Sequence, residues 1–186
     1  VLDPSVGLKE NVIALDLTSL YPTTMMTINA SYETKVLPGQ TFEPSEVYCA
    51  PNGVRFWKSF DGMTRKMMTD LLKERTAKKK ERDTHPYDSQ EYKLYDLQQR
   101  VVKEIMNSYY GVSGFKSYRL YDLEIGAAVT STGRGLIEFT KQEIEGKKVL
   151  TPTETDDPDM TDLADLDLDV IYGDTDSCLV HFPPMP

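Results

Sequence analysis

A short apolar run near the start of the chain predicts the first β-strand. Residues 11–17 lie between segments that contain proline and glycine, so the pattern predicts a buried strand, and the Tyr21-Pro22 pair after it predicts a turn. The range 38–62 is rich in proline and glycine, and we expect it to form loops with short strands such as Val54 to Trp57.

In the middle of the chain, apolar residues recur at helical spacing and predict three helices. The first covers Met63 to Arg82 beneath a basic face. The second is capped by Asp88 or Ser89 and runs to about Asn107, so that the two helices form an antiparallel hairpin. The third covers Leu123 to Glu145, and its many small residues allow a close approach to a sheet.

Near the end of the chain, apolar residues at 170–172 and 178–182 flank a stretch with a glycine turn. This pattern predicts a β-hairpin whose tip carries Asp174 and Asp176. Carboxylates buried at a strand end favour a bound cation. Because no cluster of cysteine or histidine accompanies them, the expected cation is one that prefers oxygen ligands, Mg²⁺ or Mn²⁺ ahead of Zn²⁺.

Length and composition limit the class of protein. With 186 residues, 39% of them hydrophobic, the chain can bury one core, or one core with an appended lobe. No apolar run is long enough to span a bilayer, and no leader or lipidation motif is present, so we expect a soluble, intracellular protein. The two cysteines, Cys49 and Cys178, are far apart in sequence and do not support a disulfide framework.

A net charge of −9 by itself disfavours nucleic-acid binding, but the charges are not spread evenly along the chain. Eight acids and no base lie between 151 and 170, and without them the net charge would be −1. Residues 71–82 carry six basic side chains against two acidic ones. The acidity is therefore mostly one local insert, and a basic patch remains elsewhere.

Three segments resemble motifs of the family B DNA polymerases, in the order found there. Asp16 to Pro22 shows the first palm motif, Asp-x-x-Ser-Leu-Tyr-Pro, in full. Lys103 to Gly111 is similar to the finger motif Lys-x-x-x-Asn-Ser-x-Tyr-Gly, and Tyr172 to Ser177 matches Tyr-Gly-Asp-Thr-Asp-Ser at every position. Leu71 to Lys79 resembles the first finger helix. Each segment alone has a simpler explanation, as a helix cap, a solvated helix face or a calcium loop, but together they favour the family.

The resemblance implies an α+β fold and a domain order. The expected palm is an antiparallel sheet with flanking helices, and an antiparallel helical hairpin, the fingers, is inserted into it. Palm residues would be 1–60 and 111–186, the fingers 61–110, and the acidic insert 151–169. No stretch resembles the exonuclease domain or the thumb of that family, so the resemblance implies a piece of a catalytic core. Tyr32 stands where archaeal relatives commonly have proline, which questions the shape of that loop.

The implied activity is that of a DNA-directed DNA polymerase, which adds dNTPs to a primer 3′-hydroxyl during replication. Two Mg²⁺ ions, with Mn²⁺ as a substitute, would do the chemistry. Their expected catalytic ligands are Asp16, Asp174 and Asp176, with the Leu17 carbonyl as a further ligand. The expected partners are primer-template DNA and dNTPs, and a sliding clamp through regions outside this chain, in an archaeal cell or a virus-infected host.

The resemblance also implies a set of substrate contacts. Tyr21 resembles the steric gate that excludes a 2′-hydroxyl, and Arg75 with Lys79 would reach the triphosphate. Lys103, Asn107 and Tyr110 share one helix face by their spacing. The expected nucleotide-binding residues are Leu17, Ser19, Leu20, Tyr21, Arg75, Lys79, Lys103, Asn107 and Tyr110. The expected DNA contacts are Tyr110, Gly111 and Thr175.

Two other hypotheses compete with this one. In the first, the chain is a polymerase-like module that binds nucleic acid without catalysis, inactive without exonuclease and thumb domains. In the second, the acidic insert is a calcium-binding loop. The insert lacks the ordered Asp-x-Asp-x-Asp-Gly pattern with its later Glu, which disfavours the calcium hypothesis.

Overall fold

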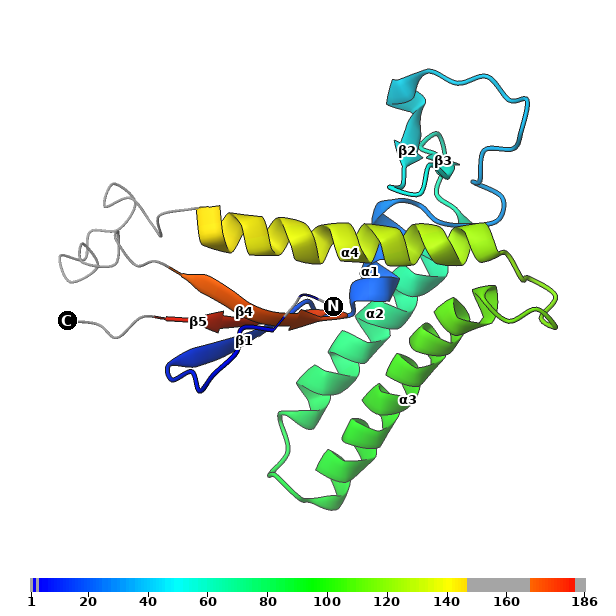
Figure 1. Ribbon diagram of the computed structural model, residues 1–186. Helices are drawn as coiled ribbons and strands as arrows, with labels where there is room; N and C mark the ends of the chain where they lie inside the picture. Colours follow the sequence, from blue (N-terminus) through cyan, green and yellow to red (C-terminus); the bar gives the residue numbers. More distant parts are fainter. Residues whose placement is uncertain (1, 3, 147–167, 183–186) are drawn as a thin grey trace, which may run out of the picture. The chain divides into compact units, whose positions relative to one another are not determined.

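The computed structural model describes residues 2, 4–146 and 168–182 and combines helices with small antiparallel sheets (Figure 1). The chain divides into two compact units. The first contains Val1–Thr18 and Gly133–Pro186, and the second contains Ser19–Thr132. The insert predicted at 151–169 lies outside the described residues except for its last two positions.

The first unit contains a three-stranded antiparallel sheet in the order β1-β5-β4. Its strands are β1 (Val12–Asp16), β4 (Asp169–Asp174) and β5 (Ser177–His181), drawn in blue, orange and red in Figure 1. The predicted strand near the start of the chain and both strands of the predicted hairpin are confirmed. The sheet brings together segments that lie more than a hundred residues apart in sequence.

One face of this sheet packs against α4 (Leu123–Gly146). Val170 of β4 and Cys178 and Val180 of β5 are buried with Ile137 of α4 in one cluster. Because side chains alternate along a strand, Ser177 and Leu179 point to the opposite face. The sheet thus has a core face and a face turned away from α4.

The strand β1 corrects one expectation, because all five of its residues are exposed rather than buried. Val12 is 37% exposed, Ile13 50% and Leu15 45%. Within the described residues β1 pairs only with β5, so it is an edge strand, and the core gathers at β4, β5 and α4 instead. A short apolar run does not distinguish an edge strand from a central one.

The strand β4 contains two irregularities. Its pairing with β5 shifts between Val170 and Tyr172, so Ile171 is the extra residue of a β-bulge. Gly173 lies in the strand and not in the turn that the sequence suggested. The backbone of Leu2 pairs with it, Leu2 N donating to Gly173 O at 2.7 Å, and a Cβ at Gly173 would lie 2.7 Å from the Leu2 side chain.

The second unit is built on a helical hairpin of α2 (Met63–Arg82) and α3 (Gln90–Ser113), which lie side by side in Figure 1. Met68 of α2 packs against Val102 and Met106 of α3 in a buried cluster. The predicted hairpin and the Ser89 cap are confirmed, since Ser89 Oγ accepts from Tyr92 N at 3.1 Å. The helix α3 continues six residues past the predicted end, to Ser113, and Gly111 does not terminate it.

The helix α1 (Leu20–Thr27) corrects the turn expected at Tyr21-Pro22. Pro22 is its third residue, a position where the backbone N–H has no partner within the helix, so proline is tolerated. Ser19 precedes the helix with φ 57°, in the left-handed region. The chain therefore turns sharply at Ser19 and enters a helix at once.

A second core in this unit joins α1 to the first part of α4. Met25 of α1 and Ile28, the first residue after the helix, are buried with Phe56, Ile125 and Val129 in one cluster. Phe56 comes from β3 (Arg55–Trp57), which pairs with β2 (Val47–Cys49). A 3₁₀ turn, η1 (Pro44–Glu46), precedes β2. The short strand predicted in this loop-rich range is confirmed, and β2 is its partner.

The loop around Tyr32 has a defined shape in this unit. The Tyr32 hydroxyl donates to the carbonyl of Leu120, which ties the loop to the segment before α4. Burial, with smaller contributions from neighbouring acidic groups, raises the pKa of Tyr32 to about 12. No helix among the described residues is long and apolar enough to cross a membrane.

Candidate functional site

The three predicted acids lie at one end of the sheet in the first unit. Asp16 of β1 and Asp174 of β4 both pair with Ser177 of β5, one from each side. Residues directly opposite each other in an antiparallel pair share a face, so Asp16 and Asp174 point to the face turned away from α4. The Leu17 N–H donates to the Asp176 carbonyl at 2.7 Å, which ties the end of β1 to the hairpin tip.

The hairpin tip is a tight turn of two residues, Thr175 and Asp176. Thr175 has φ 52°, a conformation that β-branched residues rarely adopt. Its hydroxyl donates to Asp174 Oδ1 at 3.1 Å, and Ser177 Oγ donates to the Asp174 carbonyl at 3.3 Å. One of these bonds fixes the carboxylate of Asp174 and the other fixes its backbone carbonyl.

The acids are more open to solvent than expected. Asp16 is exposed, and Asp174 and Asp176 are half-buried, which corrects the prediction of buried carboxylates. Their oxygen-only donors suit Mg²⁺ or Mn²⁺, ions that keep several waters and need few protein ligands. No group of three or more Asp, Glu, His or Cys side chains in the described part of the chain converges closely enough to hold a metal ion. The oxygen donors and their shared position at one end of the sheet suit such an ion.

The first palm motif continues into the second unit at the start of α1. Tyr21 stacks on Tyr110 of α3, with ring centroids 4.5 Å apart and an interplanar angle of 17°. Burial, and then the neighbouring Tyr21, raises the pKa of Tyr110. The stack fixes the predicted gate residue against the helix that carries the finger motif.

Arg75 of α2 reaches the same region through two hydrogen bonds. Its Nη1 donates to Ser19 Oγ at 3.1 Å, and its Nε donates to Gln99 Oε1 at 3.3 Å. The side chain is half-buried. Lys79, one turn further along α2, is also half-buried. The structure thus brings together Ser19, Tyr21, Arg75 and Tyr110 around the start of α1.

Lys103 and Asn107 lie on α3 as predicted, and both are exposed. Within the described residues neither side chain makes a hydrogen bond or ion pair, so both remain available to a ligand. Gly111 is exposed near the end of the same helix. Leu20 is buried, so only its backbone can serve a nucleotide.

Sequence reasoning missed Gln99, which contacts Arg75. Gln99 lies four residues before Lys103, so it belongs to the stripe that the finger motif occupies. Extending that stripe by one turn towards the N-terminus would have included it. The strained φ of Ser19 had no sequence signal, because serine shows no preference for this conformation.

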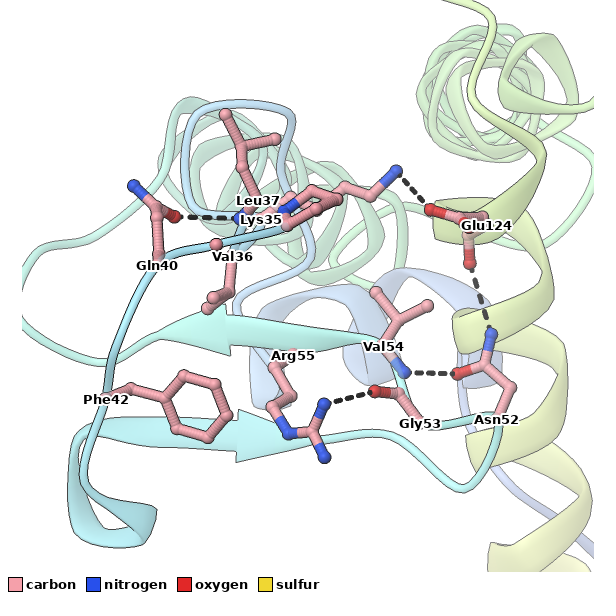
Figure 2. Close-up of a pocket in the computed structure, with 12 residues that line it drawn as sticks. Lys35, Val36, Leu37, Gln40, Phe42, Asn52, Gly53, Val54, Arg55 and Glu124 are labelled. Atoms are coloured by element: carbon pink, nitrogen blue, oxygen red, sulfur yellow. Dashed lines mark hydrogen bonds and ion pairs between the residues drawn. The ribbon is translucent and has the colours of Figure 1, made fainter.

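A separate hollow of about 490 Å³ lies in the second unit (Figure 2). It is formed by the loop from Lys35 to Phe42, by residues 52–55 and by Glu124. Lys35 pairs with Asp122 at 2.6 Å and with Glu124 at 2.7 Å. These ion pairs neutralise the lysine and join the loop to the start of α4. They stabilise the fold and leave no free charge on Lys35 for a ligand. None of the predicted site residues lines this hollow.

Comparison with known proteins gives one consistent family. The sequence model described as DNA polymerase family B matches residues 1–185. A DNA polymerase 2 of Aeropyrum pernix is 36% identical over 185 residues, which cover 99% of this chain and 21% of that protein. A DNA polymerase of Thermococcus gorgonarius is 37% identical over 185 residues, 98% of this chain and 21% of that protein.

A solved structure agrees with the sequence matches. The family B DNA polymerase of the hyperthermophilic archaeon Pyrobaculum calidifontis superimposes with a TM-score of 0.69 at 33% identity. The match covers 97% of this chain and 21% of that chain. The present chain therefore spans about a fifth of the length of the proteins it resembles.

Proposed function

The chain belongs to DNA polymerase family B, and from this premise we propose that it forms the catalytic palm and fingers of a DNA-directed DNA polymerase. The observation that carries the proposal is the placement of Asp16 and Asp174 on either side of Ser177, on one face of the sheet. Two carboxylates brought together from distant segments, with a third at the hairpin tip, would supply the oxygen donors that metal-assisted nucleotidyl transfer requires.

In this proposal Asp16 and Asp176 would be the main metal ligands, Asp174 would be a secondary ligand, and the Leu17 carbonyl would add an oxygen. Bound Mg²⁺ supplies activation of the primer 3′-hydroxyl and neutralisation of the leaving pyrophosphate. The exposure of Asp16 leaves its carboxylate accessible to an ion that keeps several waters. The hydrogen bonds at the turn orient Asp174 before the ion binds.

The second unit would bind the dNTP. Arg75, Lys79 and Lys103 would take the triphosphate through charge-assisted hydrogen bonds, and Ser19 with the Leu20 backbone would support the phosphates. Tyr21, held by its stack on Tyr110, would lie beneath the sugar. The remaining assignments place Asn107 and Tyr110 at the nascent base pair, and Gly111 and Thr175 at the DNA.

The domain order follows from these roles. We assign 1–60 and 111–186 to the palm and 61–110 to the fingers, whose hairpin corresponds to α2 and α3. Primer-template DNA is then the macromolecular partner. Contact with a sliding clamp stays a prediction.

Primer extension by the 186-residue chain tests the proposal, with Mn²⁺ and a high protein concentration to favour weak activity. Asp176→Asn and Asp16→Asn should each abolish incorporation. Asp169→Asn is the matched control, because Asp169 lies in the same sheet at its other end, paired with His181. This control should retain the activity of the unmodified chain.

Other results would contradict the assignment in different ways. Incorporation by Asp176→Asn at the rate of the unmodified chain would remove Asp176 from the site. If the unmodified chain binds primer-template DNA but incorporates no nucleotide, the non-catalytic module is the better description of this chain.

A further inference from the structure

Gln99 is a nearly buried polar residue that links the Arg75 guanidinium to a carboxylate. It is 6% exposed, on α3, one turn before Lys103. Its Oε1 accepts from Arg75 Nε at 3.3 Å, and its Nε2 donates to Asp96 Oδ1 at 3.1 Å. Glutamine suits this position because one end of its amide accepts and the other end donates.

Asp96 fixes which way this amide points. It pairs with Arg82 at 3.0 Å and with Arg100 at 2.6 Å. The hydrogen bond from Arg82 and the further contacts lower the pKa of Asp96, so its carboxylate is ionised and only accepts. Gln99 must therefore present its amide nitrogen to Asp96. Its oxygen is left facing Arg75, which only donates.

We propose that Gln99 is a positioning residue for nucleoside triphosphate binding, which holds the Arg75 guanidinium in place through its amide oxygen. Gln99 Oε1 accepts from Arg75 Nε, and Ser19 Oγ accepts from Arg75 Nη1. The Arg75 guanidinium is therefore fixed by two hydrogen bonds at different nitrogens. A free arginine loses rotamer freedom when it binds a phosphate. An arginine held in advance loses less, which raises affinity.

The proposal rests on the role of Arg75 proposed above, and it goes further by adding a residue that the motifs do not include. A merely structural Gln99 would serve the α2–α3 packing alone. That packing has other supports, namely the buried Met68, Val102 and Met106 and the pair between Arg82 and Asp96. Loss of the Gln99 amide should therefore leave the hairpin folded.

The test measures the affinity of the 186-residue chain for fluorescent mant-dATP and mant-dAMP with Mg²⁺. Gln99→Met keeps the length of the side chain and removes the amide. It should weaken mant-dATP binding about five- to tenfold, which is within the range for the loss of one ordinary hydrogen bond to Arg75. Its mant-dAMP affinity should not change, because Arg75 serves the outer phosphates. The thermal midpoint reports whether the variant remains folded.

A matched control lies next in the sequence. Gln98 is on the same helix, and its Oε1 is buried with no hydrogen-bond partner among the described residues. Gln98→Met should therefore leave mant-dATP affinity unchanged. In an Arg75→Ala background, Gln99→Met should have no further effect, because Gln99 acts through Arg75.

The NMR signal of the Arg75 Nε–H reports positioning without any nucleotide. Its exchange with water should be slow in the unmodified chain and in Gln98→Met, and fast in Gln99→Met. An unchanged signal in Gln99→Met would overturn the inference, as would equal loss of mant-dATP and mant-dAMP binding. If Arg75→Ala does not weaken mant-dATP binding, the proposed triphosphate role of Arg75 fails, and the role of Gln99 in binding fails with it.

Discussion

Tyr21 and Tyr110 lie face to face, and this contact couples the proposed sugar gate to the finger helix. Tyr110→Ala removes the stacking partner but leaves Tyr21 in place, so the gate should loosen and the ratio of ribonucleotide to deoxyribonucleotide incorporation should rise. Tyr110→Phe keeps the ring and should keep the ratio. Both are measured by primer extension with matched rNTP and dNTP. A ratio that is unchanged in Tyr110→Ala would separate the stack from sugar discrimination.

Gly62 shows how tightly the second unit is packed before α2. A Cβ there would lie 2.7 Å from Ser31 Cβ and 2.9 Å from Thr34 Cγ2, and both residues are almost fully buried. Gly62→Ala should therefore lower the free energy of unfolding by roughly 1–3 kcal/mol, measured by urea denaturation.

Gly111 provides the opposite case for the same substitution. A Cβ there would meet nothing within 4 Å, and the residue is exposed near the end of α3. Gly111→Ala should raise the free energy of unfolding by up to about 1 kcal/mol, because alanine loses less backbone entropy in a helix. Equal effects at the two glycines would show that packing around Gly62 is not the cause.

Tyr32 should make stability depend on pH in the alkaline range. Its pKa is about 12 in the folded state against 10.0 ordinarily, chiefly because of burial. Below about pH 10 the hydroxyl is protonated in both states and its hydrogen bond to Leu120 contributes fully. Between about pH 10 and 12 the unfolded state releases the proton first, so stability falls as pH rises.

The comparison with Tyr32→Phe isolates this effect from the other tyrosines. At pH 8.5 the variant should be less stable by about 1 kcal/mol, the loss of one hydrogen bond. Towards pH 12 the difference in stability between the two proteins should shrink. Because the Tyr32 ring is only partly buried, this decrease should be smaller than the full pKa shift implies. Urea midpoints at several pH values measure it. A difference that is constant with pH would contradict the assignment.

At the scale of elements, the cap of α3 contributes to the helical hairpin. Ser89 Oγ accepts from Tyr92 N and so satisfies one of the free N–H groups at the helix start. Ser89→Ala should lower the free energy of unfolding by about 1 kcal/mol. Asparagine caps equally well, so Ser89→Asn should keep most of the stability in the same denaturation experiment. Equal losses in the two variants would show that the cap bond is not what the alanine removes.

The sequence predicted those elements whose pattern is local. The bounds of α2 agree at both ends, because apolar spacing and the basic face continue without a breaker from Met63 to Arg82. The helix α1 was missed because proline near a strand end favours a turn, and only tertiary structure shows that Pro22 falls in the first turn of a helix. The bulge at Ile171 was invisible because its neighbours are also apolar.

The candidate site also has some features that the sequence shows and others that only the tertiary structure shows. The motifs identified Asp16, Asp174 and Asp176, but only the strand register shows that the first two lie on either side of Ser177. Their exposure could not be predicted, because burial depends on which strand is at the edge of the sheet. Gln99 required the three-dimensional contact with Arg75, since its own spacing marks it only as one more residue on the stripe.

At the scale of the whole molecule, each compact unit has its own hydrophobic core. The cluster of Ile137, Val170, Cys178 and Val180 lies entirely in the first unit. The clusters around Phe56 and around Met68 lie entirely in the second. Because 19–132 is continuous in sequence, it contains everything that its own two cores require.

We therefore expect the segment Ser19–Thr132 to fold when it is produced alone. Circular dichroism should show helix, and heating should give a cooperative transition. A shorter segment, 19–114, is the matched control, because it lacks Ile125, Ala128 and Val129 of the buried cluster. Removing three fully buried side chains should cost several kcal/mol, enough to unfold a small domain. A disordered 19–132, or a 19–114 that is equally stable, would show that the cores do not define independent folding units.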